Sequence, residues 1–173
     1  MDLFDYMRKT NQENDSPLAM RLRPRTLEEV VGQQHIVGKD KLLYRAIKAD
    51  KLSSIIFYGP PGTGKTTLAK VIAHTTSAEF MQINATSAGK KDMEAVIEKA
   101  KQLQGMYGKR TILFIDEINC VSETLAPMML QFLQGKTFGN QKVPEGWVIV
   151  TAGNPPEYNK SVREFDVVTL DRI

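Results

Sequence analysis

Residues 59–66 read Gly59-Pro60-Pro61-Gly62-Thr63-Gly64-Lys65-Thr66, and the apolar run Ile55-Ile56-Phe57-Tyr58 comes immediately before them. The spacing matches G-x-x-x-x-G-K-[ST], a loop whose backbone N–H groups surround phosphate at the start of a helix. Such a loop needs a strand before it and a helix after it. The apolar run supplies the strand, and Leu68, Val71 and Ile72 recur at helical spacing afterwards. The sequence therefore predicts a strand, a phosphate-binding loop and a helix.

The positions of this loop have separate predicted roles. Lys65 is expected to reach the terminal phosphates of a nucleotide, and the Thr66 hydroxyl is expected to ligate Mg²⁺. The predicted nucleotide-binding residues of the loop are Gly59, Pro60, Pro61, Gly62, Thr63, Gly64, Lys65, Thr66 and Thr67. We therefore expect ATP and Mg²⁺ as cofactors.

Composition and charge exclude few functions. The chain has 173 residues, of which 42% are hydrophobic and 25% charged, as in an ordinary soluble domain. No apolar stretch approaches the roughly 20 residues needed to span a bilayer, and the single Cys120 forms no internal disulfide. We expect a cytoplasmic protein without membrane contact. The net charge of +3 is the sum of +4 in residues 1–118 and −1 in residues 119–173, so the basic excess of the first part is either scattered solvated charge or a surface for a polyanion.

Apolar patterns alternate between strands and helices along the chain. Strands are predicted at about 52–58, 80–84, 111–115 and 147–151, and helices at about 40–49, 92–104 and 124–134, besides the helix after the loop. A capping box, Thr26 with Glu29, predicts one more short helix that ends near Gly32. Residues 1–17 are polar and are predicted to form a flexible arm before an ATPase core at 18–173. Alternation of this kind indicates a three-layer α/β fold with a mainly parallel sheet.

Polar side chains follow two of the predicted strands. Asp116 and Glu117 come directly after Thr111-Ile112-Leu113-Phe114-Ile115, a run that is apolar at every position from Ile112 on and so typical of a central strand. Paired carboxylates there predict one ligand for the Mg²⁺ shell, Asp116, and one group that activates water, Glu117. Asn154 follows the last predicted strand, where it is either a turn residue before Pro155 or a sensor of the γ-phosphate.

The motifs G-P-P-G-T-G-K-T and I-L-F-I-D-E resemble those of the AAA+ ATPase superfamily. The resemblance implies ATP hydrolysis, assembly into homo-oligomers and a first-sensor role for Asn154. AAA+ cores continue into a fifth strand beside the phosphate-loop strand and then a helical lid. We expect this chain to lack the lid and the fifth strand, which leaves one edge of the strand at 55–58 unpaired.

Residues 18–118 are more specifically similar to the replication-associated recombination protein A family, clamp-loader relatives that act at DNA ends and stalled forks. The similarity rests on Leu18-Ala19-Met20-Arg21-Leu22-Arg23-Pro24, on the stretch 31–38 and on the stretch 110–118. It implies an adenine pocket formed by Val31, His35 and Ile36. For His35 a purely structural role is equally open.

Residues 119–173 resemble MoxR-type AAA+ proteins instead, so the chain looks like a mosaic joined after Ile118. Arg172 occupies a position similar to the arginine finger that acts on ATP of a neighbouring subunit, or it is simply a terminal residue. Three functions remain open from the sequence. These are an ATPase of DNA replication, recombination and repair, a MoxR-like remodeller of protein complexes, and a nucleotide-binding fragment without turnover.

Overall fold

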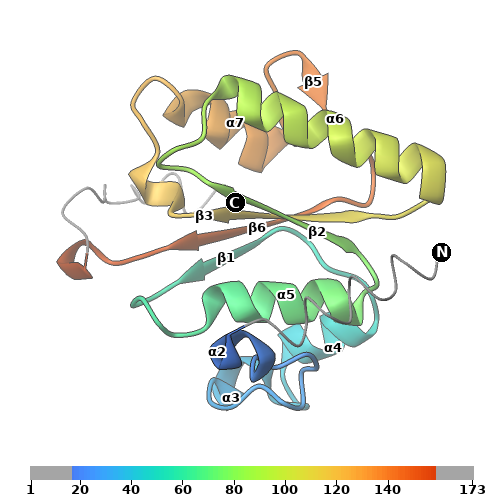
Figure 1. The fold of residues 1–173 in the computed structure, drawn as a ribbon, viewed down its shortest axis with the longest axis vertical. Helices are drawn as coiled ribbons and strands as arrows, with labels where there is room; N and C mark the ends of the chain where they lie inside the picture. Colours follow the sequence, from blue (N-terminus) through green and yellow to red (C-terminus); the bar gives the residue numbers. More distant parts are fainter. Residues whose placement is uncertain (1–16, 159–173) are drawn as a thin grey trace.

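A parallel four-stranded sheet forms the centre of the computed structural model, which describes residues 17–158 (Figure 1). The strands are β1 (Ile55–Tyr58), β2 (Glu79–Asn84), β3 (Thr111–Asp116) and β6 (Val148–Gly153). They lie in the order β1-β6-β3-β2, and all three pairings are parallel. Arg172 and all of the predicted arm except Pro17 lie outside the described residues.

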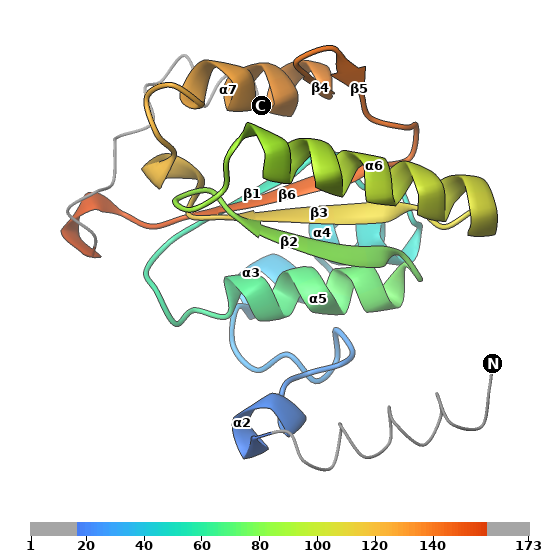
Figure 2. The ribbon, with the colours of Figure 1, turned by 45° about the horizontal axis from the view of Figure 1, so that its top comes forward.

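Helices cover both faces of this sheet. Helices α6 (Lys90–Tyr107) and α7 (Ala126–Gly135) lie on one face. Helix α5 (Lys65–Thr75) lies on the other, together with α3 (Gln34–Val37) and α4 (Leu42–Lys48); α2 (Leu18–Arg21) lies farther out, as Figure 2 shows. The predicted three-layer α/β fold is thereby confirmed.

Strand β3 packs against helices on both faces of the sheet, which explains its unbroken apolar run at 112–115. Leu113 and Ile115 pack into the core beneath α6 and α7, whereas Ile112 and Phe114 pack into the core against α5. Successive side chains of a strand point to opposite faces, so a strand between two helical layers must be apolar at every position. The predicted central place of this strand is confirmed.

All four strands end at one edge of the sheet. Asn84 lies beside Asp116, and Tyr58 lies beside Gly153, in the parallel registers of their strands. The phosphate-binding loop, the turn after β3 and the segment after β6 therefore leave the sheet close together. In an open α/β sheet this is the edge that binds ligands.

Two helix predictions were wrong in detail. The capping box at 26–29 forms a turn and no helix, because the Glu29 carboxylate accepts a hydrogen bond from the Arg25 N–H at 2.8 Å. Helix α6 was predicted to end near Gly105 but continues to Tyr107. Gly105 is exposed and keeps its helical backbone, and the helix ends at Gly108, whose φ of 62° suits a left-handed cap.

The predicted loop 135–146 contains a small hairpin. Strands β4 (Thr137–Phe138) and β5 (Gln141–Lys142) pair in antiparallel fashion after α7. Phe138 is fully buried edge-on against Phe132, with 5.9 Å between ring centroids, and this contact fixes the hairpin on its helix. Strands of two residues are too short to show an alternating apolar pattern, so no sequence pattern predicts them.

Within residues 17–158, β1 pairs only with β6. None of the helices described in this part of the chain is both long enough and apolar enough to cross a membrane.

Candidate functional site

The phosphate-binding loop joins β1 to α5 through two glycines in a left-handed conformation. Gly62 has a φ of 79° and Gly64 a φ of 85°, values that are costly for residues with a Cβ. The Thr63 hydroxyl donates to the Pro60 carbonyl at 2.9 Å across the loop. Gly64 also precedes the first residue of α5, so the loop wraps round the N-terminus of that helix. The free backbone N–H groups of a helix N-terminus held in this way suit the binding of an anion.

Lys65 closes this loop from inside. Its ammonium donates to the carbonyls of Gly59 and Pro60 and to Asn154 Oδ1, each at 2.8 Å. Burial lowers the pKa of Lys65, and the nearby Asp116 carboxylate partly opposes that shift. All three acceptors are neutral oxygens, so phosphate oxygens can replace them and form stronger, charge-assisted hydrogen bonds.

A cavity of about 450 Å³ opens beside Lys65, and we call it the polar cavity. Its lining is contributed by the loop, by the ends of β2, β3 and β6, and by the segment after α2. The lining residues are Arg23, Pro61, Gly62, Gly64, Lys65, Thr66, Thr67, Asn84, Asp116, Glu117 and Asn154. The structure therefore brings together the five residues predicted for phosphate, metal, water and sensing, although they come from distant parts of the sequence.

Asp116 and Glu117 differ in environment although they are neighbours. Burial raises the pKa of Asp116, and the Glu117 charge adds to this, whereas the Glu117 N–H, 3.1 Å from Asp116 Oδ1, and Lys65 lower it. Glu117 adopts a left-handed backbone with a φ of 54°. Its carbonyl accepts from the Cys120 N–H at 2.8 Å, which begins the short helical turn η1 (Ile118–Cys120). This turn reverses the chain, and both carboxylates line the polar cavity.

Asn84 belongs to the site and was missed in the sequence. Its Nδ2 donates to Glu117 Oε2 at 3.1 Å, and its Oδ1 accepts from the backbone and hydroxyl of Thr86 at 2.9 and 2.6 Å. Both ends of the amide are therefore engaged, and one end holds the Glu117 carboxylate. A signal was available, because Asn84 is a polar residue at the carboxyl end of a predicted parallel strand.

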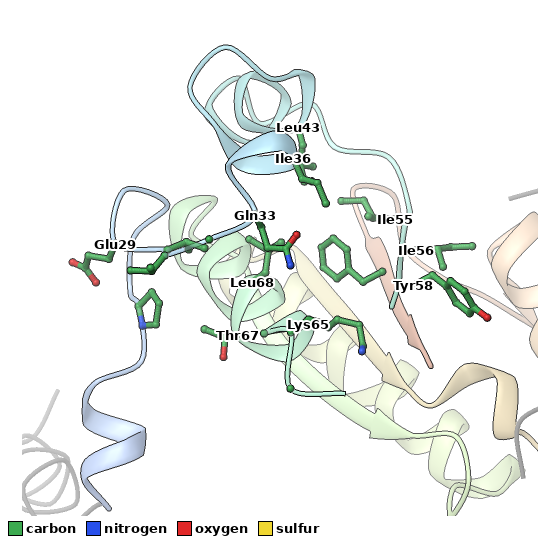
Figure 3. A pocket seen from close by; sticks show the side chains of 18 of the residues that line it. Glu29, Gln33, Ile36, Leu43, Ile55, Ile56, Tyr58, Lys65, Thr67 and Leu68 are labelled. Carbon is green, nitrogen blue, oxygen red and sulfur yellow. The ribbon is translucent and has the colours of Figure 1, made fainter. Parts of the chain in front are cut away.

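A second cavity of about 790 Å³ continues from the first, and we call it the apolar cavity. Figure 3 shows Ile36 and Leu43, from the segment before β1, and Ile55 of β1 at one end, with Lys65 nearer the loop. The lining residues are Leu22, Pro24, Glu29, Val30, Val31, Gly32, Gln33, Ile36, Leu43, Ile55, Ile56, Phe57, Tyr58, Gly62, Thr63, Gly64, Lys65, Thr67 and Leu68. Gly62, Gly64, Lys65 and Thr67 line both cavities, so the two form one continuous site.

The predicted adenine pocket is placed only in part. Val31 and Ile36 line the apolar cavity, but His35 is exposed and does not line it. In the four-residue helix α3, neighbouring side chains point in different directions, so Ile36 faces the cavity and His35 does not. Arg23 was named from the sequence only as part of the stretch 18–24 and was given no role. The structure places Arg23 in the lining of the polar cavity, where it is a second cation beside Lys65 and comes from a different part of the chain.

Comparison with known proteins agrees with this geometry. Residues 55–170 match the model of the AAA family, described as the ATPase family associated with various cellular activities. The chain belongs to the AAA family. The matched region of this AAA chain includes the phosphate-binding loop at 59–66 and the carboxylates of Asp116 and Glu117.

Two relatives of this AAA chain are proteins named replication-associated recombination protein A. The protein from Coxiella burnetii is 52% identical over 103 residues, which cover 60% of this chain and 23% of that protein. The protein from Escherichia coli K12 is 44% identical over 121 residues, which cover 70% and 27%. This chain spans about a quarter of the length of these relatives. The predicted likeness to that family is confirmed; the MoxR-like character of residues 119–173 stays a prediction.

Solved structures show the same fold. RuvB from Thermotoga maritima, described as a Holliday junction branch migration motor, has a TM-score of 0.63 and 24% identity over 88% of this chain and 46% of that one. Its P216G mutant gives a TM-score of 0.66 at 24% identity over 88% of this chain and 47% of that one. At this identity the likeness supports the AAA fold alone.

Proposed function

We propose that this chain binds Mg·ATP and hydrolyses it by attack of water on the γ-phosphate. The observation that carries the proposal is the meeting of Lys65, Thr66, Asp116, Glu117 and Asn154 in one cavity at the carboxyl edge of the sheet. Family membership supports the same reaction.

The two cavities divide the nucleotide between them. The apolar cavity suits a purine base, because aliphatic side chains such as Ile36, Leu43 and Ile55 line it. The polar cavity suits the phosphates, because it holds Lys65 and the N-terminus of α5. Both cavities share the loop at their junction, which is where the phosphate chain would pass from one to the other.

The residues present also fit Mg²⁺. Mg²⁺ prefers oxygen ligands and is usually held by one or two carboxylates together with substrate phosphates. The Thr66 hydroxyl and the Asp116 carboxylate both line the polar cavity and supply such oxygens. A Mg²⁺ ion held by Thr66 and Asp116 would neutralise charge on the phosphates.

The remaining residues account for the reaction. Lys65 holds terminal phosphate oxygens, and the carboxylate of Glu117 orients a water molecule and takes its proton. The water oxygen forms a bond to the γ-phosphorus while the bond from phosphorus to the β,γ-bridging oxygen breaks, which yields ADP and phosphate. Asn154 contacts the γ-phosphate side through its amide. The Asn84 amide holds Oε2 of Glu117, which leaves the other carboxylate oxygen to accept from the water.

We further propose that ATP turnover serves DNA replication, recombination or repair. The support is the similarity to replication-associated recombination protein A at 42–52% identity. The wall residue Arg23 and the basic excess before residue 118 are compatible with a polyanionic partner. Homo-oligomers through AAA interfaces and an arginine finger at Arg172 belong to the same proposal.

The test is steady-state ATP hydrolysis and equilibrium ATP binding by the chain and by Glu117→Gln, each with and without forked or single-stranded DNA. Glu157→Gln, an exposed carboxylate outside both cavities, is the matched control. We expect Glu117→Gln to bind ATP and to lose turnover by about 100-fold or more, the usual contribution of a general base.

Each outcome separates the functions. Turnover stimulated by DNA and abolished in Glu117→Gln supports the repair ATPase. Turnover indifferent to DNA favours the MoxR-like remodeller, and ATP binding without turnover in the unmodified chain identifies a nucleotide-binding fragment. Failure of the chain to bind ATP would overturn the proposal altogether.

A further inference from the structure

The side chain of Asn119 is a buried amide that no motif of the sequence explains. It lies in η1, two residues after Glu117, and only 5% of its surface is exposed. A buried amide needs hydrogen-bond partners, because burial without them is costly. Both partners of Asn119 belong to one residue. Its Nδ2 donates to the Asn154 carbonyl at 2.7 Å, and its Oδ1 accepts from the Asn154 N–H at 3.4 Å.

The backbone at Asn154 depends on these bonds because the sheet no longer supports it. Strand β6 ends at Gly153, whose carbonyl accepts the bond from the Gly59 N–H at 3.3 Å. Pro155 and Pro156 follow and have no N–H to donate. Asn119 thus bonds to both the N–H and the carbonyl of Asn154, the first residue after strand β6.

The position of Asn154 matters because its side chain reaches Lys65. Asn154 Oδ1 accepts from the Lys65 ammonium at 2.8 Å. A continuous series of contacts therefore runs from η1, which follows the two carboxylates, through Asn119 and Asn154 to the lysine of the phosphate-binding loop. Asn119 does not line the polar cavity, but it holds the backbone of Asn154, which does.

We infer that Asn119 is a positioning residue for ATP hydrolysis: it fixes Asn154 to the turn after β3 so that the Asn154 amide meets Lys65 and the γ-phosphate. This inference rests on the proposed function for its catalytic consequence. Its structural part, the attachment of Asn154 to η1, holds with or without nucleotide.

Two measurements on the full chain test the two parts. The first is amide hydrogen exchange of residues 148–158 without nucleotide, in Asn119→Ala, in Asn119→Asp and in the control Asn140→Ala. Asn140 is an exposed asparagine between β4 and β5. We expect exchange to be about 10-fold faster in both Asn119 variants, the effect of losing roughly one well-formed hydrogen bond, and unchanged in the control. Unchanged exchange in the Asn119 variants would overturn the inference.

The second measurement is kcat together with the Kd for Mg·ADP, in Asn119→Asp, Asn154→Ala and the double variant. Asn119→Asp keeps the size of the side chain and replaces its donor by a carboxylate oxygen that repels the Asn154 carbonyl, whereas alanine removes the whole amide. We expect the Kd for ADP to stay within about twofold, because the loop is untouched, and kcat to fall about 10-fold in each single variant. The double variant should be no slower than Asn154→Ala, since Asn119 acts through Asn154.

Losses that multiply in the double variant would show that Asn119 does not act through Asn154, and the inference would fall. An unmodified chain that binds no nucleotide would defeat the proposed function instead, while the exchange result would still decide the attachment of Asn154.

Discussion

The two cavities of the site are built in opposite ways. The polar cavity is lined by the phosphate-binding loop with the start of α5 and by residues at the ends of regular strands, such as Asn84, Asp116 and Asn154. The apolar cavity is walled by β1 on one side and, on the other, by the mostly irregular segment that precedes it, which includes Val31 and Ile36. Strand ends hold chemical groups at fixed separations, whereas an irregular segment supplies contact area. We therefore expect substitutions in the first to impair phosphate binding and turnover, and substitutions in the second to weaken base binding.

The largest effect is expected in the polar cavity. Lys65→Met removes the charge that faces the phosphates and should weaken Mg·ATP binding by about 100-fold, the equivalent of one or two charge-assisted hydrogen bonds. Equilibrium titration with a fluorescent ATP analogue measures this. Lys70→Met is the control, since Lys70 lies on the same helix with its ammonium over the Phe80 ring, 5.6 Å from the centroid. Equal losses in both variants would contradict a phosphate role for Lys65.

A smaller and different effect is expected in the apolar cavity. Ile36→Ser removes apolar contact worth roughly 1 kcal/mol, so ATP binding should weaken about fivefold. Binding of inorganic tripolyphosphate should not change, because it has no base. Leu42→Ser is the control, as Leu42 is 77% exposed and lines neither cavity. If tripolyphosphate binding also weakened, the division of the nucleotide between the cavities would be wrong.

Arg23 is an exception to this comparison, because it belongs to the irregular segment before β1 and yet lines the polar cavity. Arg23→Ala should weaken ATP and tripolyphosphate alike by about threefold, as expected for one exposed charge. Arg21→Ala removes a charge two residues away that lines neither cavity and should have no effect. Isothermal titration measures the Kd of each variant for both ligands. Equal losses of affinity in Arg21→Ala and Arg23→Ala would show that only the net charge of the chain matters.

The smallest effect concerns how the irregular segment is attached. Glu28 accepts from the Tyr44 hydroxyl at 2.9 Å and lies 3.1 Å from the Lys48 ammonium, which joins the segment to α4. A backbone hydrogen bond, and then Tyr44 and Lys48, lower the pKa of Glu28 to about 2 from 4.5. Because the folded-state pKa is the lower one, this stabilisation is complete above pH 4.5 and is lost as the pH falls towards 2.

Urea unfolding of the unmodified chain and of Glu28→Gln, compared from pH 6 to pH 2.5, measures this contribution. The stability difference between the two should be largest at pH 6 and should shrink as the pH falls below 4.5. A constant difference would show that the Glu28 charge contributes nothing to the attachment.

Much of the fold was accessible from the sequence for a physical reason. Positions 112–115 of β3 had to be apolar, and Gly62, Gly64 and Lys65 had to stand at fixed spacing, because local geometry and burial on both faces admit few alternatives. The short helix expected at 26–32 failed because Glu29 bonded to the Arg25 backbone, a competition that propensity alone does not resolve.

The sequence by itself determined the phosphate-binding loop, the paired carboxylates and the layer order, since each depends on neighbouring residues or on a repeating apolar pattern. Only the tertiary structure decided which side chains meet across the sheet edge. Asn84 reaches Glu117, and Asn119 reaches Asn154, although 33 and 35 positions separate the partners. Such meetings depend on the strand order β1-β6-β3-β2, which brings distant strand ends together and which no local pattern encodes.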